Sequence, residues 1–428
     1  MPLFIVLYNL LFFIITAALM PIIPVYILGD KKRKSVFRQR LCFSLSGFCF
    51  EQRPIWIHAL SVGEALASIP LVEGIKNLFK EYPIAFSCST HSGFEIAKKS
   101  LGNSCCVFYA PYDTLWGVRK AVRQINPAIF ILLETDLWPN LLFEMKRIGV
   151  PSILANVRIS PQSFKRYALF SWFTRQVFSS LSCVAAQTQG DAEKLEGIGV
   201  DPARIKITGN IKFDMPVERI SEDEVSLLKK SLYLHKASKV FLAGSTHGGE
   251  EEMLIPTIQG LKKNHPDLVM LIAPRDIQRA DAVRGMFERA GFNAQKKTLL
   301  NNNGRMPEVI VLDTIGELRR FYSIADIVFI GGSFVNIGGH NPLEPAMFGK
   351  PILFGPYMYN FAWIADALIQ SGGAIRVNHP NALQKEITRL IHAPVLASQV
   401  GENALRVLDE NRGSVNRTIK IIAGLMAS

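Results

Sequence analysis

Hydrophobic and polar positions along most of the chain alternate between two kinds of segment. From residue 54 onward, short apolar and β-branched runs are followed by longer stretches in which apolar residues recur every three or four positions. In the stretch 137–148, for example, Leu141, Leu142 and Met145 fall on one face of a helix. Strands that alternate with amphipathic helices are typical of βαβ units and a parallel sheet. The pattern therefore predicts an α/β fold.

The strand-like runs form two series separated by a polar segment. The first series lies at 55–59, 84–89, 129–133, 152–155, 183–186 and 205–208, and the second at 240–244, 268–273, 309–313, 327–330, 351–354 and 374–377. We predict two Rossmann-like domains, 54–214 and 240–428, joined by a linker at 215–239 and facing each other across a cleft. Ligands of such sheets bind beyond the carboxyl ends of the strands, so functional residues are expected directly after each strand.

The first 53 residues follow a different pattern. Residues 1–29 carry no charged side chain, and residues 3–28 are almost wholly apolar, long enough to cross a hydrocarbon core of about 30 Å. A basic cluster follows within 30–53, and the positive-inside rule places such a cluster in the cytosol. We predict a membrane-anchor helix at 1–29 and a basic juxtamembrane segment at 30–53. Pro21 and Pro24 leave open a shorter helix that enters one leaflet, because proline interrupts helical hydrogen bonding.

The net charge of +12 indicates anionic partners. Such a field attracts nucleic acid, an anionic membrane surface or phosphorylated substrates, and composition does not choose among them. The six cysteines form no Cys-x-x-Cys pair, and the chain contains neither a His-Glu-x-x-His motif nor an EF-hand loop. We therefore expect reduced cysteines, no metal site and no cofactor.

Two glycine-rich loops in the second half are candidates for binding a nucleotide sugar. The first loop contains Gly244, Ser245, Thr246 and His247. The second contains Gly332, Ser333, Gly338, Gly339, His340, Asn341 and Glu344. Each leads from a strand towards a helix, where backbone N–H groups and the helix N-terminus favour a phosphate. The alternative is that the glycines serve only the geometry of the turns.

Two charged residues complete this candidate site. Glu344 is expected to accept hydrogen bonds from ribose hydroxyls, although a carboxylate at this position also suits a helix start. Arg275 follows the predicted strand at 268–273 and could supply the matching cation; the alternative is an exposed arginine at a helix start.

Two glutamates in the first half follow buried strands directly. Glu64 comes after the strand at 55–59, and Glu134 after the strand at 129–133. A sugar hydroxyl that attacks an anomeric carbon needs a base, and a carboxylate at a strand end can serve. The alternative for each is a favourable charge at a helix N-terminus. We expect His58 and His247 to be structural or binding residues rather than catalysts.

Five segments together resemble the bacterial 3-deoxy-D-manno-octulosonic acid (Kdo) transferases, glycosyltransferase family 30. They are WIHALSVGE at 56–64, ETDLWPN at 134–140, NVRIS at 156–160, GNIKFD at 209–214, and 331–346 with its GGHNPLEPA ending. The resemblance spans nearly the whole chain.

This resemblance implies a GT-B fold, CMP-Kdo as donor, a lipid A precursor as acceptor, inversion at the anomeric carbon and no metal requirement. It makes Glu64 the general base and Glu134 a second essential acid, and it places Arg275, Gly338, Gly339 and Glu344 on nucleotide-binding segments. Arg275 or Lys212 would then stabilise the leaving CMP. We assign acceptor binding to Arg158, Lys165 and Arg166.

The implied location is the cytoplasmic face of the bacterial inner membrane. The implied partners are CMP-Kdo, the lipid A precursor and the anionic membrane surface, with no nucleic acid. Two alternatives stay open: another membrane-associated GT-B transferase that uses a UDP-sugar, and a membrane protein that binds a nucleotide without catalysis. The number of Kdo units transferred and their linkages are also open.

Overall fold

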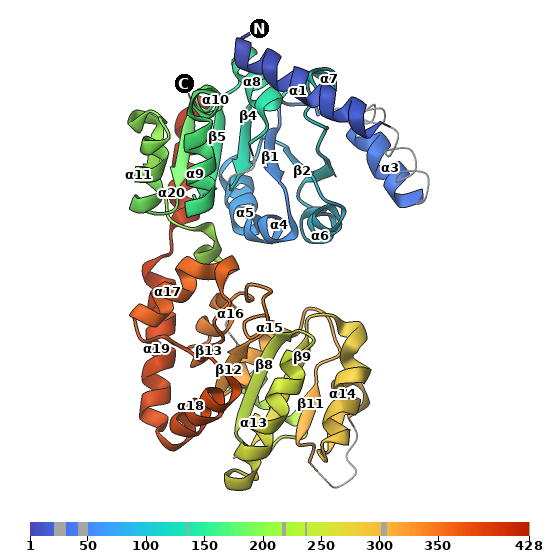
Figure 1. Cartoon of the computed structure of the whole chain (residues 1–428), viewed down its shortest axis with the longest axis vertical. Coiled ribbons are helices and arrows are strands. Elements are labelled where there is room, and N and C mark those ends of the chain that lie inside the picture. The colour runs from blue at the N-terminus through green and yellow to red at the C-terminus, as the bar shows by residue number, and fades with distance from the viewer. Residues whose placement is uncertain are drawn as a thin grey trace. The chain divides into compact units, whose positions relative to one another are not determined.

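The protein is described by a computed structural model that covers residues 1–20, 31–41, 50–134, 137–215, 220–235, 238–300 and 306–427. The chain divides into two compact units: Met1–Pro216 together with Asn411–Ser428, and Val217–Glu410. Within the described residues, each unit contains one seven-stranded sheet whose strands are all parallel. Helices cover both faces of each sheet (Figure 1). The prediction of two parallel-sheet α/β domains is confirmed.

The sheet of the first unit has the strand order β3-β2-β1-β4-β5-β6-β7. Its strands are β1 (Ile55–Ala59), β2 (Ile84–Cys88), β3 (Cys106–Tyr109), β4 (Ile129–Leu133), β5 (Ser152–Val157), β6 (Cys183–Ala186) and β7 (Ile205–Ile207). Side chains alternate between the two faces, so Ile55 and Ile57 join one hydrophobic cluster while Trp56 joins the other. This two-sided burial explains why the central strands are continuous apolar runs.

The described helices of the first unit mostly pack into these two clusters. They are α1 (Leu3–Leu19), α3 (Lys31–Arg40), α4 (Val62–Ala67), α5 (Ile69–Leu78), α6 (His91–Leu101), α7 (Leu115–Ile125), α8 (Pro139–Arg147), α9 (Pro161–Leu169), α10 (Ser171–Phe178), α11 (Gln189–Gly197) and α20 (Ser414–Ala427). Residues of α7, α8, α10 and α11 contribute to one cluster, and residues of α4, α5, α6 and α20 to the other.

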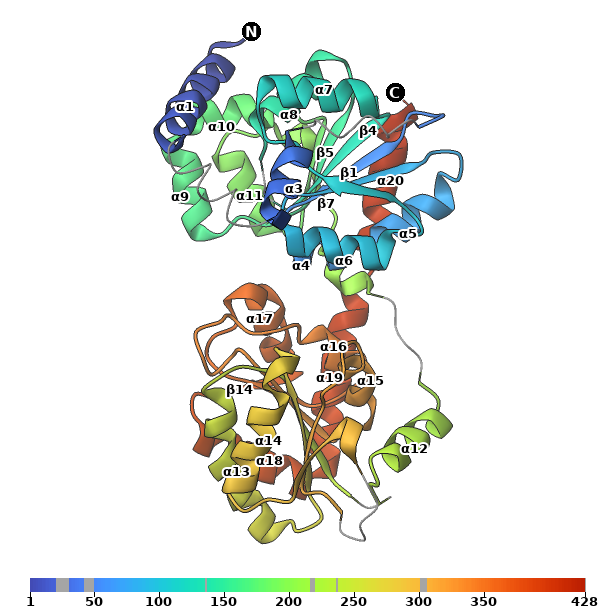
Figure 2. The same ribbon diagram turned by 90° about the vertical axis from the view of Figure 1, so that its right-hand side faces the viewer.

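Helix α20 returns from the end of the chain to the first unit, beside α5 (Figure 2). Ile419 and Ile422 are buried in the cluster that also contains Ile75 of α5. The Asp214 carboxylate accepts hydrogen bonds from the N–H groups of Gly413 (2.6 Å) and Val415 (2.5 Å) at the start of α20. Residues 411–428, which were expected to belong to the second domain (240–428), therefore belong to the first unit.

The sheet of the second unit has the order β10-β11-β9-β8-β12-β13-β14. Its strands are β8 (Val240–Thr246), β9 (Val269–Pro274), β10 (Ala294–Lys296), β11 (Val309–Val311), β12 (Ile327–Ile330), β13 (Ile352–Phe354) and β14 (Ala374–Arg376). Its helices are α12 (Glu222–Ser231), α13 (Glu250–Asn264), α14 (Ala280–Arg289), α15 (Leu318–Phe321), α16 (Leu343–Ala346), α17 (Ala362–Gln370), α18 (Pro380–His392) and α19 (Pro394–Glu410). Helix α12 lies inside the predicted linker, where a capping box of Ser221 and Glu224 begins it.

Helix α1 packs on the first unit through one face only. Phe4 and Ile5 are buried in a core cluster, and the side chains of Asn9 and Asn140 hydrogen-bond reciprocally at 2.7 and 3.0 Å. Leu7, Leu11 and other apolar residues of α1 are exposed. Residues 21–29 of the expected anchor, and residue 30 of the basic segment, lie outside the described residues. Among the helices that are described, none is both long and apolar enough to cross a bilayer.

Candidate functional site

The carboxyl ends of the strands gather polar residues at one edge of the first unit's sheet. At the end of β1, the buried His58 ring lies 2.8 Å from Ser87 Oγ through Nδ1 and 3.3 Å from Ser89 Oγ through Nε2. Trp56 donates its indole N–H to the same Ser87 hydroxyl at 2.8 Å. These contacts fix the loop ends of β1 and β2 and agree with a structural role for His58.

Glu64 lies in the first turn of α4 and is nearly buried. Its carboxylate accepts hydrogen bonds from the Leu60 N–H (2.6 Å) and the Ser61 hydroxyl (3.2 Å). Glu64 therefore caps its own helix, as the alternative interpretation expected. The general-base role stays a prediction.

Glu134, directly after β4, forms an ion pair with Lys212, which lies in the short 3₁₀ turn Ile211–Asp214 that follows β7. Glu134 adopts a left-handed backbone conformation (φ 58°), and its Oε1 atom lies 3.0 Å from Lys212 Nζ. Asn156, at the end of β5, is also left-handed (φ 60°) and accepts a hydrogen bond from the Ile211 N–H at 3.1 Å. Non-glycine residues in this conformation cost about 1–3 kcal/mol each and tend to cluster at functional sites. Residues 135 and 136, which follow Glu134, lie outside the described residues.

The three residues assigned to acceptor binding lie on the same unit. Arg158 follows β5 and is partly exposed, whereas Lys165 and Arg166 are exposed on α9. Arg166 borders an apolar groove of about 750 Å³, lined by side chains of α1, α9 and α10 and by Leu137 and Pro139. Leu137 and Pro139 belong to the segment that begins at Glu134, so the groove and the ion pair share one loop.

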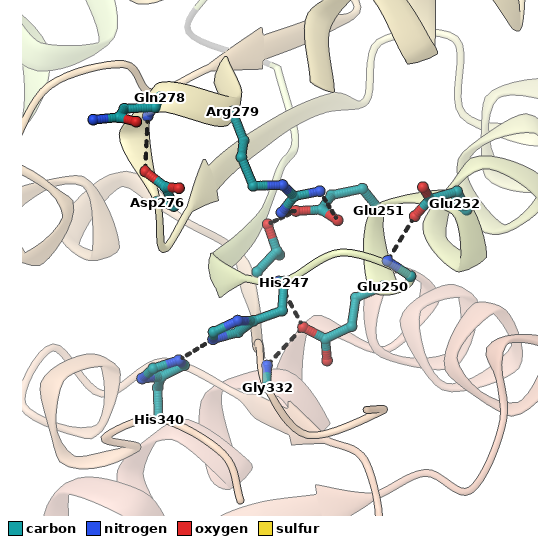
Figure 3. A network of polar contacts seen from close by, with 11 residues as sticks. His247, Glu250, Glu251, Glu252, Asp276, Gln278, Arg279, Gly332 and His340 are labelled. Atoms are coloured by element: carbon teal, nitrogen blue, oxygen red, sulfur yellow. Dashed lines mark hydrogen bonds and ion pairs between the residues drawn. The ribbon is translucent and has the colours of Figure 1, made fainter. Parts of the chain in front are cut away.

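In the second unit, both glycine-rich loops meet at Glu250, the first residue of α13 (Figure 3). The buried Glu250 carboxylate accepts hydrogen bonds from four backbone N–H groups, those of His247, Gly332, Ser333 and Phe334. Burial raises the Glu250 pKa, and these four donors oppose that shift. The two loops are therefore joined through one buried carboxyl group.

The same loops bring two histidines into contact. The Nε2 atoms of His247 and His340 lie 2.8 Å apart, and the rings stack in nearly parallel planes (Figure 3). Burial lowers the His340 pKa to about 4, with smaller contributions from Arg275 and His247. Arg275 is exposed directly after β9, where its N–H donates to the Thr246 carbonyl at 2.9 Å. His247, His340 and Arg275 thus gather at the carboxyl ends of the central strands, where anions are expected.

Gly338 and Gly339 have positive φ values of 100° and 71°. A Cβ atom on Gly338 would lie 2.4 Å from the Tyr359 ring, and one on Gly339 would lie 2.2 Å from Met358 Sδ. Both glycines are therefore required by the loop's own geometry, as the steric alternative proposed.

Glu344 and Asn341 lie where this loop meets α16. Burial raises the Glu344 pKa, while Arg319, Arg275 and a hydrogen bond from Asn341 act in the opposite direction. Asn341 also accepts a hydrogen bond from the Leu343 N–H at 3.1 Å. Helix α16 is a single turn, shorter than the helix expected to present its N-terminus to a phosphate. A role for Glu344 in binding ribose stays a prediction.

Several predicted nucleotide-binding residues are buried in the structure, among them Gly244, Thr246 and Ser333. Thr246 donates its hydroxyl to Glu251 at 3.0 Å, and Ser333 donates to the Ile330 carbonyl while accepting from the Gly355 N–H. A Cβ on Gly244 would lie 2.3 Å from the Tyr322 hydroxyl. Internal hydrogen bonds therefore occupy the Thr246 and Ser333 side chains, and the assignment of these residues to nucleotide-sugar binding stays a prediction.

The sequence pattern gave no role to Glu250 and its neighbours. Glu251 is buried and pairs with Arg279 at 2.8 Å, and Glu252 accepts a hydrogen bond from the Gly249 N–H at 2.9 Å. Three consecutive glutamates directly after a glycine-rich loop were the available signal. Within the described part of the chain, no group of three or more His, Cys, Asp or Glu side chains could hold a metal ion.

Comparisons with known proteins show which family the sequence resembles. The sequence profile described as "3-Deoxy-D-manno-octulosonic-acid transferase (kdotransferase)" matches residues 35–215. The 3-deoxy-D-manno-octulosonic acid transferase of Haemophilus influenzae is 32% identical over 395 residues, which cover 90% of this chain and 91% of that protein. The enzyme of the same name from Chlamydophila psittaci is 30% identical, covering 85% of this chain and 83% of that protein.

Solved structures support the fold. The UDP-GlcNAc 2-epimerase from Neisseria meningitidis, solved with UDP-GlcNAc, matches with a TM-score of 0.61 and 12% identity, covering 88% of this chain and 100% of that one. At this identity the likeness concerns the fold alone, which is GT-B-like. By its similarity to the Haemophilus influenzae enzyme along nearly its whole length, the chain belongs to the 3-deoxy-D-manno-octulosonic acid (Kdo) transferase family, and it is therefore a glycosyltransferase.

Proposed function

We propose that this protein transfers Kdo from CMP-Kdo to a lipid A precursor in lipopolysaccharide biosynthesis, with inversion at the anomeric carbon. The observation that carries the proposal is the relationship to the Haemophilus influenzae Kdo transferase over 90% of the chain. The polar strand ends of both units are consistent with it: carboxylates in the first unit, and two histidines with an arginine in the second.

In the proposed reaction, Glu64 takes the proton of the acceptor hydroxyl while that oxygen bonds to the anomeric carbon of Kdo. The bond between this carbon and the CMP phosphate oxygen breaks, and its electron pair leaves with CMP. Lys212 holds Glu134 at 3.0 Å, so this carboxylate has a fixed position from which to orient the acceptor. Arg275 or Lys212 would stabilise the negative charge that develops on CMP.

A nucleotide comparison tests the donor. Thermal unfolding of the purified protein in the presence of CMP or UDP should show stabilisation by CMP, because a ligand that binds only the folded state raises its stability. Mass spectrometry of a reaction with CMP-Kdo and a defined lipid A precursor should then show acceptor carrying Kdo. Stabilisation by UDP alone would favour the UDP-sugar alternative. CMP binding without product would favour a nucleotide-binding protein that lacks catalysis.

We also propose that the first unit associates with the anionic cytoplasmic face of the bacterial inner membrane. The outer face of α1 exposes Leu7 and Leu11, and α10 with the residue before it exposes Trp172 and Phe170. Exposed apolar patches of this kind are typical of membrane contact sites, and amphipathic helices can lie in the interface plane. Lys165 and Arg166 on the adjacent α9 would meet lipid or acceptor phosphates.

Vesicle flotation tests the membrane proposal. Phe170→Glu places a charge in the exposed apolar patch and should reduce binding to vesicles that contain anionic phospholipid. Met253→Glu is the matched control, because Met253 is an exposed apolar residue on α13 of the second unit. Equal vesicle binding by both variants and the unchanged protein would contradict a role for this face.

A further inference from the structure

Glu250 is a fully buried carboxylate at the start of α13. It accepts more hydrogen bonds than the capping of a helix requires. Its Oε2 atom accepts from the N–H groups of His247 (3.0 Å) and Gly332 (2.6 Å). Its Oε1 atom accepts from Ser333 (3.0 Å) and Phe334 (2.9 Å). Only the His247 contact is local to α13, whereas the other three donors lie 82 to 84 positions away along the chain. The carboxylate therefore connects two loops rather than only starting a helix.

A buried carboxylate is costly unless donors satisfy it, because it loses its hydration. Here four N–H groups converge on one side chain that has no exposed surface. If the side chain were neutral or shorter, some of these donors would be buried without an acceptor, which is also unfavourable. The arrangement is therefore specific to a glutamate in its ionised form.

The contacts around Glu250 close into a ring. Glu250 Oε2 holds the Gly332 N–H, and the Gly332 carbonyl accepts the Gly339 N–H at 2.8 Å. The next residue, His340, meets the His247 ring at 2.8 Å. The His247 N–H returns to the same Oε2 atom. One carboxylate oxygen thus sets the backbone positions from which both histidine rings project (Figure 3).

We infer that Glu250 is a positioning residue for donor binding: it holds both glycine-rich loops so that His247, His340 and Arg275 present a preformed binding surface to the donor phosphate. This inference rests on the proposed function, since it assumes that the loops bind the donor nucleotide. Glu250 itself does not contact the donor. It acts through the relative position of the two loops.

The test compares Glu250→Gln with Glu252→Gln in the full-length protein. The glutamine amide would turn an NH₂ group towards two of the four N–H donors, so one pair of hydrogen bonds is lost. We expect the dissociation constant for CMP to rise about tenfold or more, because the displaced loops would lose roughly one charged hydrogen bond to the phosphate. Glu252→Gln is the control, because Glu252 is exposed on the same helical turn and, among the described residues, accepts a hydrogen bond from Gly249 in its own loop rather than from the distant loop. It should bind CMP like the unchanged protein.

A second measurement detects the contact between His247 and His340 and does not depend on catalytic turnover. In protein labelled with ¹⁵N-histidine, the imidazole shifts of His247 and His340 should show the ring-to-ring hydrogen bond and the low pKa of His340. Glu250→Gln should move the His340 pKa towards its ordinary value and weaken CMP binding together. A melting temperature that falls while the histidine signals and CMP affinity stay unchanged would overturn the inference, because Glu250 would then be structural only.

Glu250→Asp keeps the inference testable if Glu250→Gln does not fold. Aspartate retains the charge but is one methylene too short to reach both loops, so the CMP affinity should still fall while folding is retained. Normal CMP affinity in this variant would refute the inference. The proposed function is judged separately on the unchanged protein: if that protein does not bind CMP at all, the donor assignment fails regardless of Glu250.

Discussion

Glu64→Gln separates two roles that the structure allows for the same side chain. The Glu64 carboxylate caps α4 through Leu60 and Ser61, and it is also the candidate general base. Glutamine keeps the size and one carbonyl oxygen, so it can retain the contact with the Leu60 N–H. It loses the charge and the second acceptor. Loss of a helix cap typically costs about 0.5–2 kcal/mol of unfolding free energy.

The catalytic effect should be much larger than this structural one. Removal of a general base commonly lowers the rate by about 10²- to 10⁴-fold. This corresponds to about 2.7–5.4 kcal/mol of transition-state stabilisation at 1.36 kcal/mol per decade. We therefore expect Kdo transfer to fall at least a hundredfold, while CMP affinity changes little because the proposed donor site lies in the second unit.

Ser61→Ala is the matched control for Glu64→Gln. Ser61 accepts from the Glu64 N–H and donates to the Glu64 carboxylate, so its removal weakens the same cap and leaves the carboxylate in place. Urea denaturation measures the loss of stability in each variant, and release of CMP in the presence of donor and acceptor measures the rate. If Ser61→Ala loses as much activity as Glu64→Gln, or if Glu64→Gln turns over normally, Glu64 is a cap and the proposed mechanism is wrong.

Three further predictions concern stability and reactivity. Asp214→Ala should lower the unfolding free energy of the first unit by about 1–2 kcal/mol in urea denaturation, because it removes the cap of α20. The control Asp201→Ala removes the cap of an exposed turn and should lower the unfolding free energy less. His340 has a folded-state pKa of about 4 against an ordinary 6.5, so the unfolded chain binds a proton at a higher pH than the folded protein does. The unfolding free energy should therefore fall as the pH drops from 6.5 towards 4. If its slope against pH is the same in His340→Gln, the prediction is wrong. Burial, aided by Glu64, raises the Cys88 pKa to about 12, so iodoacetamide at pH 8 should modify Cys88 only after denaturation. Mass spectrometry of native protein should find the partly exposed Cys106 modified before Cys88.

Most of the sheet could be predicted from the sequence because its central strands are buried on both faces. Strands β1, β4, β6 and β12 have the predicted bounds, since their apolar runs are continuous. The two strands that were missed, β3 and β10, lie at sheet edges, are short and are partly exposed. Polar residues interrupt the apolar pattern in β10, whereas β3 is an apolar run of only four residues. The position of α20 was also missed. The sequence of an amphipathic helix shows that one of its faces is buried, but not which element it packs against.

The candidate site was predicted in its location but only partly in its chemistry. The rule that ligands bind beyond strand ends identified the loops that carry Glu64, Glu134 and His340. It could not distinguish polar side chains that face outward from those, such as Ser333, that turn inward to hold the loop. The role of Glu250 was not predictable, because three of its four donors are distant in sequence and no local spacing records them.

The return of α20 makes the second unit an insertion within the first, which affects the order in which the protein can fold during synthesis. The apolar face of α5 packs against Ile419, and Gly74 leaves space there, since a Cβ on Gly74 would lie 2.4 Å from the Ile419 side chain. The ribosome synthesises this partner after the whole second unit. The α5 surface of the nascent first unit therefore lacks its α20 partner until α20 itself is made, whereas the second unit can complete its own core earlier.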